Sequence, residues 1–167
     1  FDIDIDQTDI LPEETEFCDN DPLYIYFTSG TTGVPKAVMG KNISLSHFIN
    51  WELETFQIDT NARVSQLTPI SHDPFLRDVF VPLFTGGTIC IPADRNILLS
   101  PPQLVDWLDG SKVTLIHCTP SVFAAINEVS LRPDQFADLK HVLLAGERLL
   151  TKQLIKWYGV FDDRIDI

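Results

Sequence analysis

The sequence predicts an α/β fold in which a mostly parallel sheet is flanked by helices. Short apolar runs alternate with stretches of helical spacing along most of the chain, which is typical of parallel strands covered on both faces. The 167 residues are enough for one domain with a real core. The composition, 44% hydrophobic and 22% charged, is that of a soluble globular protein.

The first half of the chain contains an irregular acidic lead-in followed by the start of the α/β unit. We assign residues 1–21 to the lead-in and residues 22–167 to the α/β subdomain. Strands are predicted at residues 23–27, 64–67 and 88–91. One helix is predicted from Leu45, Phe48, Ile49, Leu53 and Phe56, and a second from Phe75, Val79, Leu83 and Phe84.

The second half continues the same alternation. Ser100 and Gln103 have the spacing of a capping box, with Pro101 at the first helical position, and this helix ends near Gly110. A strand at 113–116 precedes a helix opened by Thr119 and Pro120. Strands at 141–144 and 164–167 then enclose a helix at 151–158.

Charge and cysteine usage exclude several classes of protein. The net charge is −12, and no basic footprint for nucleic acid is present. No apolar run approaches the roughly 20 residues of a membrane span, and no signal peptide leads the sequence. The cysteines Cys18, Cys90 and Cys118 form no CxxC pair, so zinc and disulfides are not expected and a reduced cytoplasmic location fits.

The most informative segment follows the first strand and combines hydroxyls, glycines and a lysine. Small residues let the backbone approach a ligand, while hydroxyls, backbone N–H groups and a lysine bind phosphate. Because Pro35 and Ala37 flank the lysine, the segment does not fit the P-loop pattern. It predicts an ATP phosphate site made of Thr28, Ser29, Gly30, Thr31, Thr32, Gly33 and Lys36.

Other polar features also follow predicted strands. Ligands of open parallel sheets bind beyond the carboxyl ends of the strands. Thr28, Asp73, His117 and the segment 145–147 each come directly after an apolar run. We therefore expect all of them at one edge of the sheet.

The segment from Thr28 to Ala37 resembles the phosphate-binding signature TSGTTGxPKG of the adenylate-forming superfamily, apart from alanine in place of the last glycine. This superfamily includes acyl-CoA synthetases, luciferases and the adenylation domains of nonribosomal peptide synthetases. The resemblance implies that the chain is one subdomain of a larger adenylation domain. It also implies ATP and Mg²⁺ as cofactors.

Residues 72–78 admit two interpretations. On physical grounds alone, Asp73 could cap a helix that has Pro74 at its first position, and Arg77 could pair with Asp73 or Asp78. In the amino-acid-activating members that the chain resembles, the aspartate at the place of Asp73 binds the substrate's α-ammonium group. His72 before it resembles the α-aminoadipate reductase type of adenylation domain and some peptide synthetase modules.

The resemblance extends to the later strands. It places Pro74, Arg77, His117, Leu143 and Ala145 in the amino-acid side-chain pocket, and Ala145, Gly146 and Glu147 against adenine. From the residues alone, His117 could instead be a packing or capping histidine. Arg77 and His117 together suggest a polar or acidic substrate side chain.

The family's further motifs, including its Mg²⁺-binding glutamate, do not occur in this sequence. We therefore expect a fragment of an amino-acid-adenylating enzyme that supplies a phosphopantetheine-bearing peptidyl carrier domain. The remainder of the adenylation domain is a second expected partner. The alternatives are the adenylation part of an α-aminoadipate reductase, another acyl-CoA-synthetase-like ligase, and a fragment that is inactive alone.

Overall fold

The protein contains a parallel sheet and a separate antiparallel hairpin. The computed structural model describes residues 18–28 and 33–167. In the hairpin, β1 (Pro22–Thr28) pairs with β2 (Lys36–Lys41). The parallel sheet has the order β4-β3-β5-β6. Its strands are β3 (Arg63–Ser65), β4 (Thr88–Cys90), β5 (Leu115–Cys118) and β6 (His141–Leu144).

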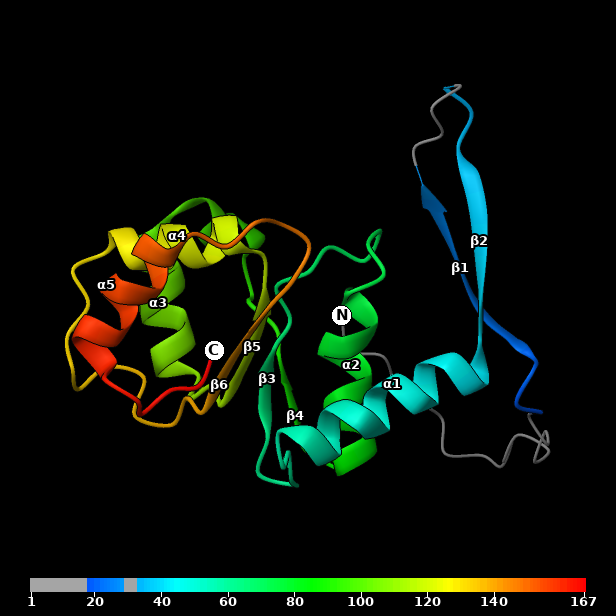
Figure 1. The fold of residues 1–167 in the computed structure, drawn as a ribbon, viewed down its shortest axis with the longest axis horizontal. Coiled ribbons are helices and arrows are strands. Elements are labelled where there is room, and N and C mark those ends of the chain that lie inside the picture. The colour runs from blue at the N-terminus through cyan, green and yellow to red at the C-terminus, as the bar shows by residue number, and fades with distance from the viewer. Residues whose placement is uncertain (1–17, 29–32) are drawn as a thin grey trace.

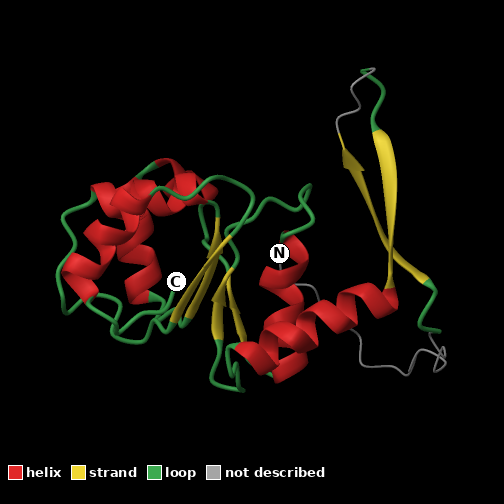
Figure 2. Ribbon diagram, in the orientation of Figure 1, coloured by secondary structure: helices red, strands yellow, loops and turns green. Residues whose placement is uncertain are grey.

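Helices cover both faces of the parallel sheet, which confirms the predicted fold class (Figures 1 and 2). One face carries α1 (Asn42–Thr55) and α2 (Phe75–Thr85). The other carries α3 (Pro101–Gly110), α4 (Pro120–Glu128) and α5 (Thr151–Phe161). A short 3₁₀ helix at Arg95–Leu99 precedes α3.

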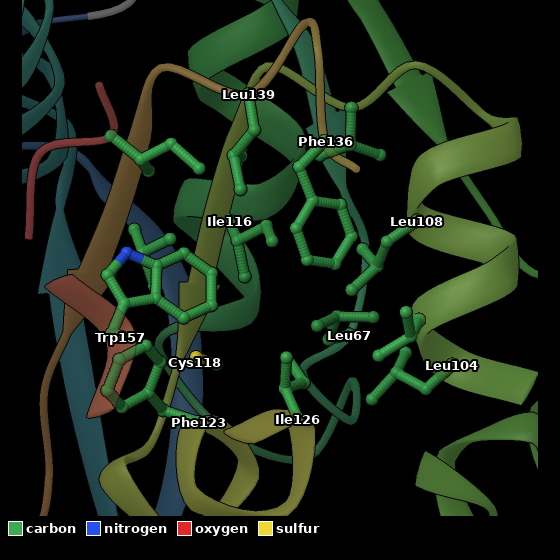
Figure 3. Packing of buried hydrophobic residues seen from close by; sticks show 14 of the residues in the cluster. Leu67, Leu104, Leu108, Ile116, Cys118, Phe123, Ile126, Phe136, Leu139 and Trp157 are labelled. Atoms are coloured by element: carbon green, nitrogen blue, oxygen red, sulfur yellow. The ribbon is translucent and has the colours of Figure 1, made fainter. Parts of the chain in front are cut away.

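The larger core lies between the sheet and α3, α4 and α5 (Figure 3). The Trp157 ring is centred 5.0 Å from the ring of Phe123 and 4.5 Å from that of Phe161. Aromatic rings at such separations add to the stabilisation from burial. A smaller core on the opposite face contains Leu45, Ile49, Ala62, Val64, Val81 and Leu115.

The order of the strands places a crevice between β3 and β5. From β3 the chain passes through α2 to β4 at one edge, and then through α3 to β5 on the other side of β3. Neighbouring connections therefore leave β3 and β5 in opposite directions. Such a reversal opens a crevice at the carboxyl ends of the two strands, where ligands of α/β proteins bind.

The first predicted strand exists, but it does not belong to the parallel sheet. The link from Thr28 to Lys36 is short, and parallel pairing needs a crossover of a dozen or more residues. The strands therefore form a hairpin, and Figure 1 shows it standing apart from the sheet. At its base, the Tyr24 ring occupies the space where a side chain at Gly40 would lie.

Several local predictions were wrong. The predicted strand at 164–167 is a single bridge between His141 and Asp166, and α5 continues through Gly159 to Phe161. The strand predicted at 113–116 runs two residues later, at Leu115–Cys118. The Ser100 side chain makes no capping hydrogen bond.

The face of α2 also differs from the expectation. Leu83 and Phe84 are exposed, whereas Val81 and Asp78 are buried. The apolar spacing located the helix correctly but not the side that packs on the sheet.

Candidate functional site

A cleft of about 530 Å³ opens at the carboxyl ends of β3 and β5. It lies where the strand order predicts a ligand crevice. The segment after β3, the start of α2, the end of β5 and the segment after β6 form its walls. Its lining residues are Leu67, Thr68, Pro69, His72, Asp73, Pro74, Arg77, His117, Cys118, Thr119, Val122, Ala145, Gly146 and Glu147.

The cleft brings together most of the predicted site residues outside the phosphate loop. These are His72, Asp73, Pro74, Arg77, His117, Ala145, Gly146 and Glu147. Leu143 is not among the lining residues and packs against the smaller core. Thr28, Gly33 and Lys36 lie in or beside the hairpin and do not line the cleft, while Ser29, Gly30, Thr31 and Thr32 lie outside the described residues.

Asp73 stands at the mouth of the cleft with an exposed side chain. It does not cap α2: the residue before the helix is Pro74, and Asp73 belongs to the preceding turn. Its carboxylate makes no hydrogen bond or ion pair within the described part of the chain. Asp73 also lines an adjoining cavity of about 330 Å³ that reaches Tyr24 at the base of the hairpin.

The hairpin is close enough to Asp73 for the two to interact electrostatically. Burial raises the pKa of Tyr26 above its ordinary value, and the negative charge of Asp73 raises it further. Strand β1, which leads into the predicted phosphate segment, therefore lies near Asp73.

Arg77 does not pair with Asp73 or Asp78. Its Nη1 atom lies 3.8 Å from Oε2 of Glu52, and its guanidinium carbon lies 5.9 Å from the centroid of the Phe48 ring. The side chain is 15% exposed and lines both cavities. No hydrogen bond engages its guanidinium among the described residues, so its N–H donors are available to a ligand.

Beneath Arg77, a fully buried histidine bridges two carboxylates. His117 Nε2 lies 2.6 Å from Glu52 Oε1, and His117 Nδ1 lies 3.0 Å from Asp78 Oδ1. A neutral imidazole has only one N–H, whereas an imidazolium donates from both nitrogens, as two carboxylate partners require. Burial lowers the pKa of His117, but the hydrogen bonds to Asp78 and Glu52 outweigh it and raise the pKa above the ordinary value.

With His117 protonated, the four groups balance in charge. Glu52 and Asp78 supply two negative charges, and His117 and Arg77 supply two positive ones. Buried charges are tolerated when they are paired and hydrogen-bonded. The backbone N–H of Thr68 adds a 3.0 Å hydrogen bond to Asp78 Oδ2 and ties the segment after β3 to α2.

Sequence analysis missed Glu52 and Asp78 as partners of His117. A signal for Glu52 existed, since it follows Leu45 and Ile49 at helical spacing, and all three are buried on one stripe of α1. A charged residue on an apolar stripe indicates a buried partner. Asp78 carries no comparable signal.

A third residue that was not predicted, Arg95, fixes the segment after β3. Its Nη1 atom donates to the Gln66 carbonyl at 3.0 Å, and Nη2 donates to the Leu67 carbonyl at 3.1 Å. The Gln66 side chain in turn donates to the Thr68 carbonyl. Arg95 therefore supplies hydrogen-bond donors to the carbonyls of Gln66 and Leu67, which lie in an irregular segment.

The segment after β6 turns sharply at Gly146, whose φ is +88°. Side chains rarely adopt this left-handed conformation, which explains the glycine. Glu147 accepts hydrogen bonds from the Ser121 backbone N–H and hydroxyl, both at 2.9 Å. A carboxylate at the first turn of α4 is also favoured by the helix dipole.

The Cys118 thiol, which also lines the cleft, is unreactive. Burial raises the pKa of the Cys118 thiol to about 12, so it stays protonated. Cys90 and Cys118 are buried, as predicted, and all three cysteines are unbridged. Within residues 18–28 and 33–167, no group of three or more His, Cys, Asp or Glu side chains could hold a metal ion. Across the same residues, no helix has the length and hydropathy needed to cross a membrane.

Comparison with protein families gives one match over nearly the whole chain. The family model described as "AMP-binding enzyme" matches residues 3–166. L-2-aminoadipate reductase of Schizosaccharomyces pombe is 35% identical over 127 residues, which are 76% of this chain and 9% of that protein. A linear gramicidin synthase chain of Brevibacillus parabrevis is 31% identical over 158 residues, which are 91% of this chain and 3% of that protein.

Solved structures have the same fold. CmiS6 superposes with a TM-score of 0.75 at 25% identity, covering 89% of this chain and 34% of that one. The adenylation domain AlmE of Vibrio cholerae, in complex with glycyl-adenosine-5'-phosphate, has a TM-score of 0.75 at 23% identity, covering 84% of this chain and 26% of that one. The chain spans only about 9% of the length of the L-2-aminoadipate reductases that it matches.

Proposed function

This chain belongs to the AMP-binding enzyme family, and on that premise we propose that it is part of a domain that activates an amino acid as its adenylate. The carboxylate of the amino acid attacks the α-phosphorus of ATP. A carboxyl oxygen–phosphorus bond forms, the bond to the β-phosphate oxygen breaks, and pyrophosphate leaves. The product is an aminoacyl-adenylate.

One observation carries the choice of an amino acid as substrate: Asp73 and Arg77 line the same cleft, and neither is neutralised by the other. A carboxylate without partners among the described residues suits the α-ammonium group of an amino acid. A guanidinium with available donors suits a carboxylate, which it can bind with two parallel hydrogen bonds. We therefore propose that the side chain of the substrate is acidic.

The remaining predicted residues take supporting roles in the proposal. The segment from Thr28 to Lys36 holds the phosphates of ATP, and its positive charge offsets repulsion between two anionic substrates. Ala145, Gly146 and Glu147 lie against adenine. His72 and Pro74 form the cleft wall beside Asp73.

Two kinds of relative support different fates for the adenylate. The L-2-aminoadipate reductases, whose name implies a substrate with a second carboxylate, fit the available guanidinium of Arg77. The linear gramicidin synthase relative supports a peptide synthetase, in which a phosphopantetheine thiol of a carrier domain takes the acyl group. An NAD(P)-binding reductase domain or a condensation domain elsewhere in the complete protein would distinguish the two.

ATP–pyrophosphate exchange by the complete protein tests the proposal. We expect amino-acid-dependent exchange that is highest with L-2-aminoadipate or L-glutamate and is reduced at least about a hundredfold by Asp73→Ala, since an ammonium left without its carboxylate loses about 3 kcal/mol. Asp138→Ala, which removes an exposed carboxylate that does not line the cleft, is the matched control and should leave exchange unchanged. Exchange with fatty or aryl acids alone would contradict the proposal. The 167-residue chain by itself should show none.

A further inference from the structure

Asp73 and Arg77 carry opposite charges and lie close together in the sequence, so they could pair with each other. The two residues are four apart in the sequence, with Asp73 in the turn before α2 and Arg77 in its first turn, and opposite charges at short range attract each other. If they paired, the proposed ammonium site and the proposed carboxylate site would neutralise each other before any substrate arrived. In the structure they do not pair, and Arg77 lies beside Glu52 of α1 instead.

We propose that Glu52 is a positioning residue that holds Arg77 away from Asp73, so that the Asp73 carboxylate stays unpaired and the N–H donors of Arg77 stay open to the cleft. The inference rests on the proposed function and assigns the selectivity of that site to a residue outside the cleft lining. Glu52 is itself fully buried and lines neither cavity, so it acts through Arg77 rather than on a substrate.

The contact with Glu52 holds the Arg77 guanidinium without using its hydrogen-bond donors. The 3.8 Å separation between Arg77 Nη1 and Glu52 Oε2 permits charge attraction but is too long for a hydrogen bond. Glu52 Oε2 has no hydrogen-bond partner, and its other oxygen, Oε1, is held by His117 at 2.6 Å. The carboxylate is thereby fixed on its inner side and presents one oxygen toward Arg77.

His117 and Asp78 complete the anchor. His117 Nδ1 is held by Asp78 Oδ1 at 3.0 Å, and Asp78 is held in turn by the Thr68 backbone. Buried charged groups of this kind are tolerated when they are paired and hydrogen-bonded. The Phe48 ring, on the same helix as Glu52 and 5.9 Å from the Arg77 guanidinium carbon, provides a second contact for the guanidinium.

The test compares Glu52→Gln with wild type in the complete protein. Glutamine keeps the shape and removes the charge, and the exposed Glu54→Gln on the same helix is the matched control. The measurement is the ratio of kcat/KM for L-glutamate to that for L-glutamine in ATP–pyrophosphate exchange. We expect Glu52→Gln to lower this ratio about tenfold, the worth of one charged hydrogen bond, with the KM for ATP within about twofold of wild type. Glu54→Gln should match wild type.

A double-mutant cycle with Arg77→Gln separates positioning from a general structural role. If Glu52 acts through Arg77, Glu52→Gln changes the ratio no further once Arg77 is glutamine. An equal fall in both backgrounds, or a ratio unchanged by Glu52→Gln alone, overturns the inference. Should Glu52→Gln fail to fold, Glu52→Asp, which withdraws the carboxylate by one methylene, carries the same cycle. Wild type that exchanges with no amino acid refutes the proposed function instead.

Discussion

The two faces of the parallel sheet are built on different physical principles. The face under α3, α4 and α5 is apolar and aromatic, with Trp157 and Phe123 fully enclosed (Figure 3). The face under α1 and α2 buries Glu52, Asp78 and His117 beside a smaller apolar cluster. Among the residues that the structure describes, buried charged side chains lie on only one of the two faces.

The difference separates stability from recognition. Burying apolar surface is favourable without any specific geometry, whereas buried charges cost desolvation that only well-placed partners offset. A charged interior is therefore poor evidence for added stability. On this sheet it lies beside the cleft, where it fixes Arg77, while the apolar face contributes most of the stabilisation.

The largest predicted effect is on the apolar face. Trp157→Ala should lower the free energy of unfolding by about 3–5 kcal/mol, because the surrounding rings cannot fill the space it leaves. Trp51→Ala is the control, since that side chain is 49% exposed and should cost under about 1 kcal/mol. Urea unfolding followed by far-ultraviolet circular dichroism measures both. Equal losses would remove the distinction between an essential and a peripheral tryptophan.

The charged face should give stability a dependence on pH. His117 has a raised pKa in the folded protein, so its contribution is complete below its unfolded pKa of 6.5 and is lost as the pH rises through the folded pKa. Stability should fall above pH 6.5 by at most about 1.4 kcal/mol per pH unit. His141, whose pKa burial lowers, titrates below this range.

Urea unfolding at several pH values measures this slope. Trp157→Ala should shift the whole curve downward and keep its slope, because the two faces share no charged contact. His117→Gln should remove the slope attributed to the histidine. A slope that survives His117→Gln would show that the buried cluster is not its source.

The smallest predicted effect compares two glycines, Gly146 after β6 and Gly110 at the end of α3. Neither Gly146 nor Gly110 is crowded, as a Cβ atom would have its nearest neighbour 3.9 Å away at Gly146 and none within 4 Å at Gly110. Gly146→Ala should cost about 1–2 kcal/mol because φ is +88°. Gly110→Ala, in α3, should gain about 0.5–1 kcal/mol. We expect the midpoint of thermal unfolding to fall for Gly146→Ala and to rise for Gly110→Ala.

Features that depend on neighbouring residues in the sequence could be predicted more readily than contacts between distant residues. The alternation of strands and helices is encoded in consecutive residues and was predicted. Strand β2 was missed because its side chains are mostly exposed on both sides, so it shows no alternation between buried and polar positions.

Contacts between distant residues could not be predicted in the same way. Arg77 was assigned to Asp73 or Asp78 because those are its neighbours along the chain, and its actual partner, Glu52, lies on another helix. The bridge from His117 to Glu52 spans 65 residues and depends on how α1 crosses the sheet. In the sequence, only the helical spacing of Glu52 with Leu45 and Ile49 indicated that this glutamate has a buried partner.

The protonated thiol of Cys118 has a consequence for the product. An acyl-adenylate is a strong electrophile, and a thiolate beside it would capture the acyl group and inactivate the protein. With a pKa of about 12, roughly one Cys118 in 100,000 is ionised at pH 7. On the proposed function, the protonated Cys118 thiol would not compete with an external nucleophile for the activated acyl group.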